Sequence, residues 1–342
     1  MKNKTNIKII SMPKISIIIP MYKTEPYLDK CMRSVLDGDF KEIEVILIDD
    51  GSPNGHECDK YAEQDSRVKV IHQENKGVAA ARNKGLRHAT APRISFVDSD
   101  DWIHPQMYKV LYKLAEEHGA DIVSCSIEEF SENQSDSTGN IIKKRKRPLE
   151  IFGNKEGLKR SLLSHPTAYS VVFAKLISKS LFNNISFPEG RVSGEDAAVA
   201  NKLYHMSKKS VHTYVSFYFY LIRGLSVTHQ AFTPFVMHKL DTANETVEYI
   251  KTYVPDLFHY ARCFEIITAL RIAAYFNKIE QKKHFIEYTT IKRILFNLDR
   301  STMAALPRRH KILICLFKYF RPMFLFVWRK RLKYSLYNKE TI

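Results

Sequence analysis

The chain has 342 residues, of which 44% are hydrophobic, and this is enough for one large α/β domain with an appendage. Its five cysteines are scattered and include no CxxC pair, which argues against a disulfide framework or a zinc site and favours a reducing cytoplasm. We expect neither secretion nor a membrane span, because no signal-type apolar region and no run of about 18 apolar residues occurs. The formal net charge of +16 favours an anionic partner surface.

Short apolar strands alternate with helical stretches in residues 1–130. The predicted order is βαβαβαβαβ, with elements at 15–20, 27–36, 45–49, 57–64, 68–73, 78–88, 94–97, 105–118 and 121–126. Such a pattern predicts a Rossmann-like, mostly parallel sheet with helices on both faces and right-handed crossovers. Residues 131–148 are polar, contain five consecutive Lys or Arg, and predict an exposed loop.

Carboxylates follow two of the predicted strands. Asp49 and Asp50 end the second strand, and Asp98, Asp100 and Asp101 follow the strand near residue 97. Because the carboxyl ends of parallel strands border one crevice, we expect all five side chains to line the same cleft. Clustered carboxylates repel one another, and hard oxygen ligands suit Mg²⁺ or Mn²⁺, so the pattern predicts a metal–diphosphate site. An acidic turn or helix cap is the alternative.

Five motifs, in this order along the chain, carry a resemblance to a known family. They are residues 17–22, 48–52, 75–83, 98–101 and 194–196. The sequence resembles the family 2 glycosyltransferases with the GT-A fold, in particular bacterial enzymes of surface polysaccharide synthesis. The resemblance implies an inverting, metal-dependent transfer from a UDP-sugar to a growing surface glycan of capsule, O-antigen or exopolysaccharide type. The implied cofactor is Mn²⁺ or Mg²⁺, and the acceptor is a glycan or a lipid-linked glycan.

The resemblance also implies which residues hold the nucleotide. Pro20 and Tyr22 would line the uridine pocket, although both also fit a strand-ending turn. Asp49 could accept a hydrogen bond from the uracil imide N–H, a contact that discriminates bases better than an apolar pocket does. Asp50 belongs to the same motif, but the Asp50-Gly51-Ser52 segment is also typical of a tight turn.

Cationic side chains lie near the start of the helix predicted at 78–88. Lys76 and Arg82 suit a diphosphate there, and pairing of Arg82 with a local carboxylate is the alternative. By resemblance, Asp98 lies near the ribose and the metal, and Asp100 ligates the metal directly. Asp101 and Trp102 would orient this loop and close the acceptor side.

Residues Gly194-Glu195-Asp196 precede a stretch with helical periodicity. Acids at a helix N-terminus are favourable as simple caps, which is the alternative explanation. By resemblance, Asp196 is the general base that takes a proton from the acceptor hydroxyl. The further candidates are Glu25, Asp101, Trp102, Glu195, Arg223 and His229. At Lys23 the chain departs from the family, in which Asn is usual after the tyrosine.

From about residue 231 the chain changes to long helical stretches, so we expect a transferase domain at 1–230 and a helical, basic extension at 231–342. Residues 306–342 contain ten Lys or Arg and one acid, and Pro322 should break or kink a helix there. This segment could lie on the anionic inner face of the cell membrane as a peripheral contact of a cytoplasmic enzyme. The alternative is a helix that packs its aromatic residues on the catalytic domain.

Two other classes of protein compete with this interpretation. The basic tail and a pI near 9.4 also fit a nucleic-acid-binding protein, but strands that end in acid would repel phosphate, so we expect no nucleic-acid partner. A nucleotidyltransferase that makes an activated sugar would share the α/β layout and the metal. It usually needs a glycine-rich phosphate loop after the first strand, and residues 21–25 do not form one.

Overall fold

The computed structural model describes residues 12–132, 149–163, 169–223 and 232–333. The α/β part contains the strands β1 Ile15–Met21, β2 Ile43–Asp49, β3 Val68–His72, β4 Arg93–Phe96, β5 Trp102–Ile103, β6 Ile122–Ser131, β7 Glu150–Phe152, β8 Lys175–Ser178 and β9 Ser210–Ile222. Its helices are α1 Glu25–Leu36, α2 Asp59–Gln64, α3 Val78–His88, α4 Met107–His118, α5 Asn154–Leu163 and α6 Glu195–Met206, with short 3-10 helices at Gly55–Cys58 and Lys179–Asn184. The expected alternation of strands and helices is therefore present in the first part of the chain.

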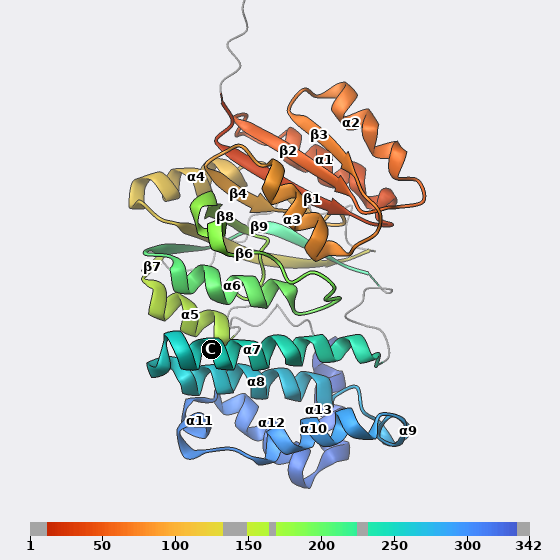
Figure 1. The fold of residues 1–342 in the computed structure, drawn as a ribbon, viewed down its shortest axis with the longest axis vertical. Coiled ribbons are helices and arrows are strands. Elements are labelled where there is room, and N and C mark those ends of the chain that lie inside the picture. Colours follow the sequence, from red (N-terminus) through yellow and green to blue (C-terminus); the bar gives the residue numbers. More distant parts are fainter. Residues whose placement is uncertain (1–11, 133–148, 164–168, 224–231, 334–342) are drawn as a thin grey trace, which may run out of the picture.

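The described strands form one nine-stranded sheet in the order β3-β2-β1-β4-β8-β6-β9-β5, with β7 paired to β9 (Figure 1). Strands β3, β2, β1 and β4 are parallel, as the sequence predicts. Beyond β4 the sheet is mixed, because β8 runs antiparallel between β4 and β6, and β9 pairs parallel with β6 but antiparallel with β5 and β7. The parallel half brings the ends of β1, β2 and β4 to one edge.

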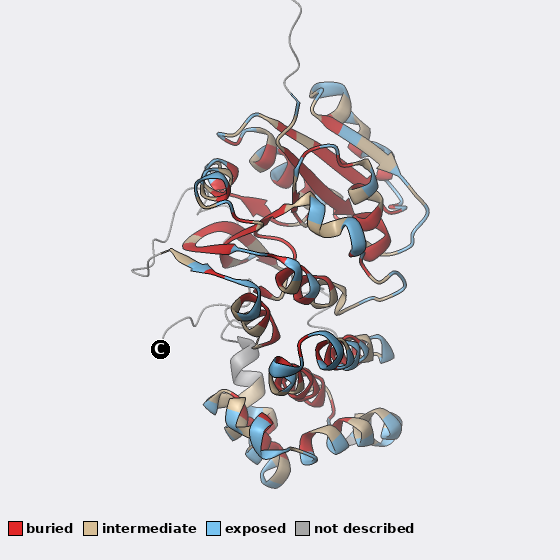
Figure 2. Cartoon of the chain, turned by 60° about the vertical axis from the view of Figure 1, so that its left-hand side comes forward, coloured by how far each residue is buried: buried red, intermediate tan, exposed pale blue. Residues whose placement is uncertain are grey.

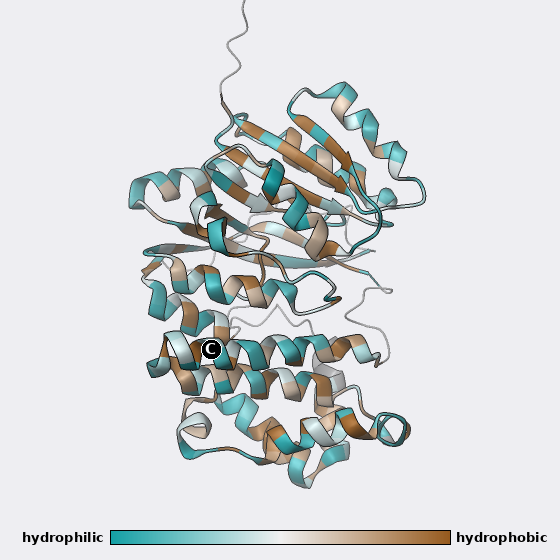
Figure 3. Cartoon of the chain, viewed as in Figure 1, coloured by the Kyte–Doolittle hydropathy of each residue, from teal (hydrophilic) through white to brown (hydrophobic). Residues whose placement is uncertain are grey.

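Helices cover both faces of the sheet, which explains why every residue of β1 except Ser16 is nonpolar. All seven residues of β1 are buried, and hydrophobic residues dominate β1 and β2 (Figures 2 and 3). One core packs α1, α2 and α4 on the sheet, and a second packs α3, α5 and α6 on the opposite face. Helix α3 approaches β1 closely at Gly85, where a Cβ would lie 2.4 Å from the Ile18 Cγ2 atom.

The rest of the described chain is helical: α7 His238–Tyr253, α8 Phe258–Ala273, α9 Lys278–Lys283, α10 Phe285–Phe296, α11 Arg300–Ala305, α12 Arg308–Tyr319 and α13 Arg321–Lys333, with short 3-10 helices at Pro234–Met237 and Pro255–Leu257. Helices α7 and α8 lie between the α/β part and the later helices (Figure 1), and α7 and the beginning of α8 share the core of α5 and α6. A separate core unites α8 with α10, α12 and α13.

The predicted break at Pro322 is confirmed, because α12 ends at Tyr319 and α13 begins at Arg321, which places the proline in its first turn. The aromatic residues of this segment divide between core and solvent. Phe317 and Phe324 are buried in the helical core. Within the described ranges, no helix is both long and apolar enough to cross a membrane.

Candidate active site

The end of β2 holds two buried carboxylates. The Asp50 carboxylate accepts hydrogen bonds from the backbone N–H groups of Lys76 and Gly77 at 2.9 and 2.8 Å and from the Gln73 amide at 2.7 Å. These bonds anchor the turn that precedes α3, in which Gly77 has a φ of 86° that favours glycine. Asp50 therefore holds the turn at residues 73–77 in place, and a nucleotide contact by Asp50 stays a prediction.

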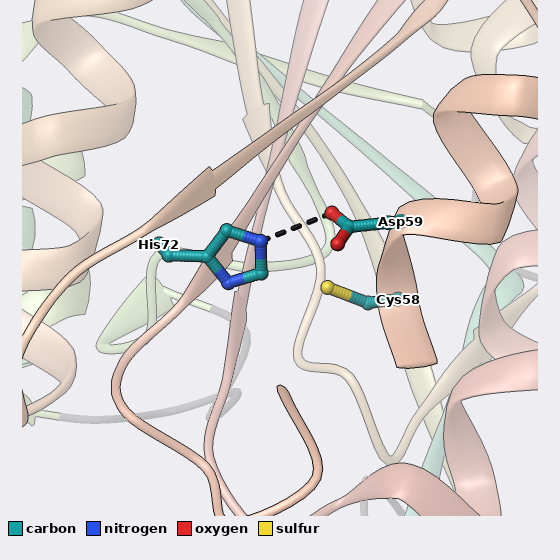
Figure 4. Close-up of side chains that lie close together, drawn as sticks. All are labelled: Cys58, Asp59 and His72. Atoms are coloured by element: carbon teal, nitrogen blue, oxygen red, sulfur yellow. Dashed lines mark hydrogen bonds and ion pairs between the residues drawn. The ribbon is translucent and has the colours of Figure 1, made fainter. Parts of the chain in front are cut away.

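Asp49 is 4% exposed, and both of its oxygens are engaged. One accepts from the Ser52 backbone N–H at 2.9 Å, and the other accepts from Nδ1 of His72 at 2.9 Å. The second ring nitrogen of His72 lies 3.0 Å from Asp59 (Figure 4). The hydrogen bonds to Asp49 and Asp59 raise the pKa of His72.

A buried guanidinium connects three carboxylates that are distant in the sequence. Arg82 is 3% exposed and donates to Asp98 at 2.9 Å, to Glu195 at 3.1 Å and to Asp196 at 2.7 Å. The structure thus brings the start of α6 against the end of β4. The pairing with Asp98 agrees with the local-carboxylate alternative for Arg82, whereas the sequence did not predict the pairing with Glu195 and Asp196. A direct nucleotide contact by Arg82 stays a prediction.

Burial gives Asp196 an unusual proton affinity. Although Arg82 opposes the effect, burial together with the charges of Glu195 and Asp98 raises the pKa of Asp196 to about 7. Its Oδ2 atom also lies 3.4 Å from the backbone nitrogen of Val172, which donates to it. A carboxyl group with a pKa near neutrality can exchange a proton in either direction under physiological conditions.

Asp100 and Asp101 lie in different surroundings although they are adjacent. Asp100 forms an ion pair with Arg223 at 2.7 Å, and burial and the charge of Asp98 raise the pKa of Asp100 to about 6. Asp101 is 1% exposed and accepts from the Tyr218 hydroxyl at 2.7 Å and from the Leu221 backbone at 2.8 Å. Asp101 therefore ties the loop after β4 to β9, while Asp100 remains partly accessible.

The other predicted residues surround this centre. Trp102 is buried under Lys30, whose Nζ lies 3.5 Å from the ring centroid, and it pairs with Phe219 on β9. Arg223 lies over the Tyr27 ring. Pro20 is buried in β1, Tyr22 and Lys76 are exposed, and Glu25 is the partly buried first residue of α1. His229 lies outside the described residues.

Sequence reasoning missed two residues that organise the site. Tyr218 donates to Asp101 and accepts from the Asp98 backbone N–H at 3.1 Å, and His72 supports Asp49. Tyr218 is one aromatic residue among several in β9, and no motif distinguishes it. His72 faces Asp49 because β3 pairs with β2 in that register, which only the assembled sheet reveals.

Comparisons with known proteins identify the family of this chain. The profile described as "Glycosyl transferase family 2" matches residues 16–185. The chain is 32% identical to glycosyltransferase GlyG of Streptococcus pneumoniae over 71% of this chain and 80% of that protein. It is 34% identical to glycosyltransferase GlyA of the same organism over 68% of this chain, but it spans only 34% of that protein. The chain belongs to glycosyltransferase family 2.

Solved structures identify the fold. The crystal structure of S. aureus TarS residues 1–349 in complex with UDP-GlcNAc is similar over 89% of this chain and 86% of that chain, with a TM-score of 0.66 and 18% identity. The same protein in complex with UDP is similar over 82% of this chain and 90% of that chain, with a TM-score of 0.52 and 21% identity. The expected GT-A fold is thereby confirmed.

Proposed function

We propose that this chain transfers a sugar from a UDP-linked donor to a hydroxyl group of a growing surface glycan, with inversion at the anomeric carbon. The observation that carries the proposal is the Arg82 cluster, which unites the candidate base Asp196 with Asp98 of the candidate donor site. A base and a donor diphosphate must lie on opposite sides of one sugar carbon, so they need this proximity. The family membership supports the same reaction class.

The donor would lie along the edge formed by the ends of β1, β2 and β4. Asp49, held by Ser52 and His72, would accept from the uracil imide, with Pro20 and Tyr22 beside the base. These hydrogen bonds already orient the Asp49 carboxylate, so less conformational entropy is lost when the base binds. TarS, which shares the fold, has been crystallised with UDP and with UDP-GlcNAc.

The side chains present fit a hard divalent cation. Asp98 and Asp100 offer carboxylate oxygens, the preferred ligands of such ions, and their side chains are 25% and 19% exposed. We propose that these two residues hold Mg²⁺ or Mn²⁺. When bound, the ion would neutralise charge that develops on the leaving diphosphate.

A residue of the chain itself would accept the proton of the acceptor hydroxyl group. As the acceptor oxygen forms its bond to the anomeric carbon, its proton passes to a carboxylate oxygen of Asp196, and the bond from that carbon to the diphosphate breaks with its electron pair on phosphate oxygen. Arg82 keeps Asp196 oriented and favours its ionised form before the reaction. Glu195 shares the same guanidinium nitrogen and would act as a positioning residue.

The test compares two Asp→Asn variants with a matched control. Release of UDP from UDP-glucose, UDP-galactose and their N-acetyl forms should be lost in Asp196→Asn, while UDP binding should persist. In Asp100→Asn, neither UDP release nor UDP binding should increase when the metal ion is added. The exposed Asp37, at the end of α1, provides Asp37→Asn as a control that should behave as the wild type. An Asp196→Asn variant that turns over at the wild-type rate would exclude this residue as the base.

We also propose that the transferase domain spans residues 1–230 and that the helical extension, 231–342, contacts an anionic membrane surface. Its later helices share a core with α8, although α7 packs in the core of α5 and α6. The junction between α12 and α13 exposes Tyr319, Phe320 and Met323 at 74%, 60% and 56%. No acidic residue occurs between residues 300 and 339, so the exposed aromatic side chains have only basic charged neighbours in the sequence. Such a combination favours binding to an anionic lipid surface.

Deleting the basic segment would be a poor test, because Phe317 and Phe324 would leave the helical core. The sharper variant is Tyr319→Ser combined with Phe320→Ser, which changes only exposed rings. It should bind vesicles that contain phosphatidylglycerol more weakly than the wild type does. Tyr253→Ser, at a residue 64% exposed on α7, is the control. Equal vesicle binding by both variants and the wild type would remove the membrane proposal.

A further inference from the structure

A second group of metal-ligating side chains lies beside β3, outside the Asp98–Asp100 carboxylates. It consists of Cys58, Asp59 and His72, and one ligand atom from each lies within 4.8 Å of the other two (Figure 4). Cys58 ends a 3-10 helix, Asp59 begins α2, and His72 ends β3. The chain therefore brings a thiol, a carboxylate and an imidazole together from two neighbouring segments.

The orientation of His72 is a second, independent observation. Its Nδ1 atom lies 2.9 Å from the buried carboxylate of Asp49, and its Nε2 atom points toward Asp59 at 3.0 Å. A histidine that ligates a metal usually donates its other ring N–H to a carboxylate, which fixes the tautomer and makes the ligating nitrogen more basic. Asp49 supplies that carboxylate here.

We propose that Cys58, Asp59 and His72 form a binding site for a zinc-type divalent ion, with water in the fourth position. Sulfur and imidazole nitrogen prefer such ions over Mg²⁺, and three protein ligands with one open position are typical of exchangeable tetrahedral sites. Side-chain exposures of 46% for His72 and 50% for Asp59 leave the site open to solvent, while the buried Cys58 closes its inner side.

The ion would replace a proton on sulfur. Without metal, burial and the charges of Asp49 and Asp59 raise the pKa of the Cys58 thiol to about 12. A coordinated thiol loses its proton, which passes to solvent, and the ion's positive charge then offsets the carboxylates nearby. The absence of a CxxC pair argued against zinc from the sequence, but the folded chain assembles a mixed set of ligands.

Such an ion would stiffen the support of Asp49. It would join the segment of Cys58 and Asp59 to the end of β3, and His72 would link it to the Asp49 carboxylate. Gly55 already packs against this carboxylate so closely that a Cβ would lie 2.0 Å from Oδ2. The inference goes beyond glycosyl transfer and does not depend on it, because the ligands are separate from Asp98 and Asp100.

Cobalt(II) distinguishes this site from the carboxylate site, because a bond between Co²⁺ and a thiolate produces a charge-transfer absorption that oxygen ligands do not. The full chain, without nucleotide, should develop this absorption with one equivalent of Co²⁺ and lose it when Zn²⁺ is added. Cys58→Ser should abolish it, and Asp59→Asn, a change at an exposed side chain, should weaken Co²⁺ binding at least tenfold.

Two controls locate the signal. Cys315→Ser removes an exposed cysteine of α12, and Asp100→Asn alters the other candidate metal site, so both variants should keep the absorption. In addition, Zn²⁺ should raise the unfolding temperature of the wild type more than that of Asp59→Asn. The proposal is overturned if Co²⁺ yields no thiolate absorption, if the absorption survives Cys58→Ser, or if it disappears in Cys315→Ser.

Discussion

Replacing Arg82 with methionine should destabilise the protein strongly, because the guanidinium is the shared partner of Asp98, Glu195 and Asp196. The side chain of Arg82 is 3% exposed, and the three carboxylates are 25%, 13% and 18% exposed. Removing one partner of a buried ion pair costs about 3–5 kcal/mol, and the partial solvation of these acids places the expected loss near the lower value, about 3 kcal/mol.

The loss should depend on pH with a definite sign. The folded-state pKa of Asp196 already lies above its usual value, so the folded chain binds more protons than the unfolded chain, and stability falls as pH rises toward about 7. Arg82 lowers this pKa, so in Arg82→Met the fall continues to higher pH. The difference between variant and wild type should therefore be larger at pH 8 than at pH 5.

Urea unfolding, followed by tryptophan fluorescence at both pH values, measures this difference. Arg33→Met is the matched control, because Arg33 forms an ion pair with Asp29 at 2.9 Å on the exposed surface of α1. It should cost no more than about 0.5 kcal/mol. If Arg82→Met costs as little as Arg33→Met, or if its loss is greater at pH 5, the cluster does not hold the site together.

Three further predictions follow from single contacts. Because burial raises the pKa of Asp196 to about 7 and the base must be ionised, kcat should rise with pH through that region, and a rate that is flat from pH 5 to 8 would contradict the assignment. Arg223→Gln frees Asp100 from its cationic partner, so Mn²⁺ binding measured by electron paramagnetic resonance should strengthen several-fold, whereas weaker binding would show that Arg223 does not compete with the ion. Lys23 has a φ of 54°, in the left-handed region that asparagine tolerates better, so Lys23→Asn should raise the free energy of unfolding by up to about 1 kcal/mol in urea titrations, and a decrease would contradict this explanation.

The acidic ends of β2 and β4 could be predicted from the sequence because the information is local. Strand β2 ends at Asp49, and Asp98 follows two residues after the end of β4 at Phe96. Both strands pair with β1 in parallel, so their ends meet at one edge. The helix expected at 78–88 also has the observed bounds, because its Ala-rich start and its hydrophobic periodicity both favour a helix.

The partners of these acids could not be predicted, because they come from distant segments. Arg82 meets Glu195 and Asp196 across more than 110 residues of chain. Asp101 meets Tyr218 across 117 residues. Strand β8 enters antiparallel between β4 and β6, and no local pattern in its four residues signals this position. Such contacts depend on which strands become neighbours, which is a property of the whole sheet.

We propose above that a UDP-linked donor binds at the edge marked by Asp49, Asp98 and Asp100. Calorimetric titration of the full chain with UDP and with GDP, each in Mn²⁺ and in EDTA, measures this binding. We expect one molecule of UDP to bind per chain in Mn²⁺ and to bind more weakly in EDTA and to Asp100→Asn. Asp49→Asn should lose the preference for UDP over GDP. Equal binding of UDP and GDP by the wild type would contradict the proposed donor site. UDP binding that changes neither with Mn²⁺ nor in Asp100→Asn would also contradict it.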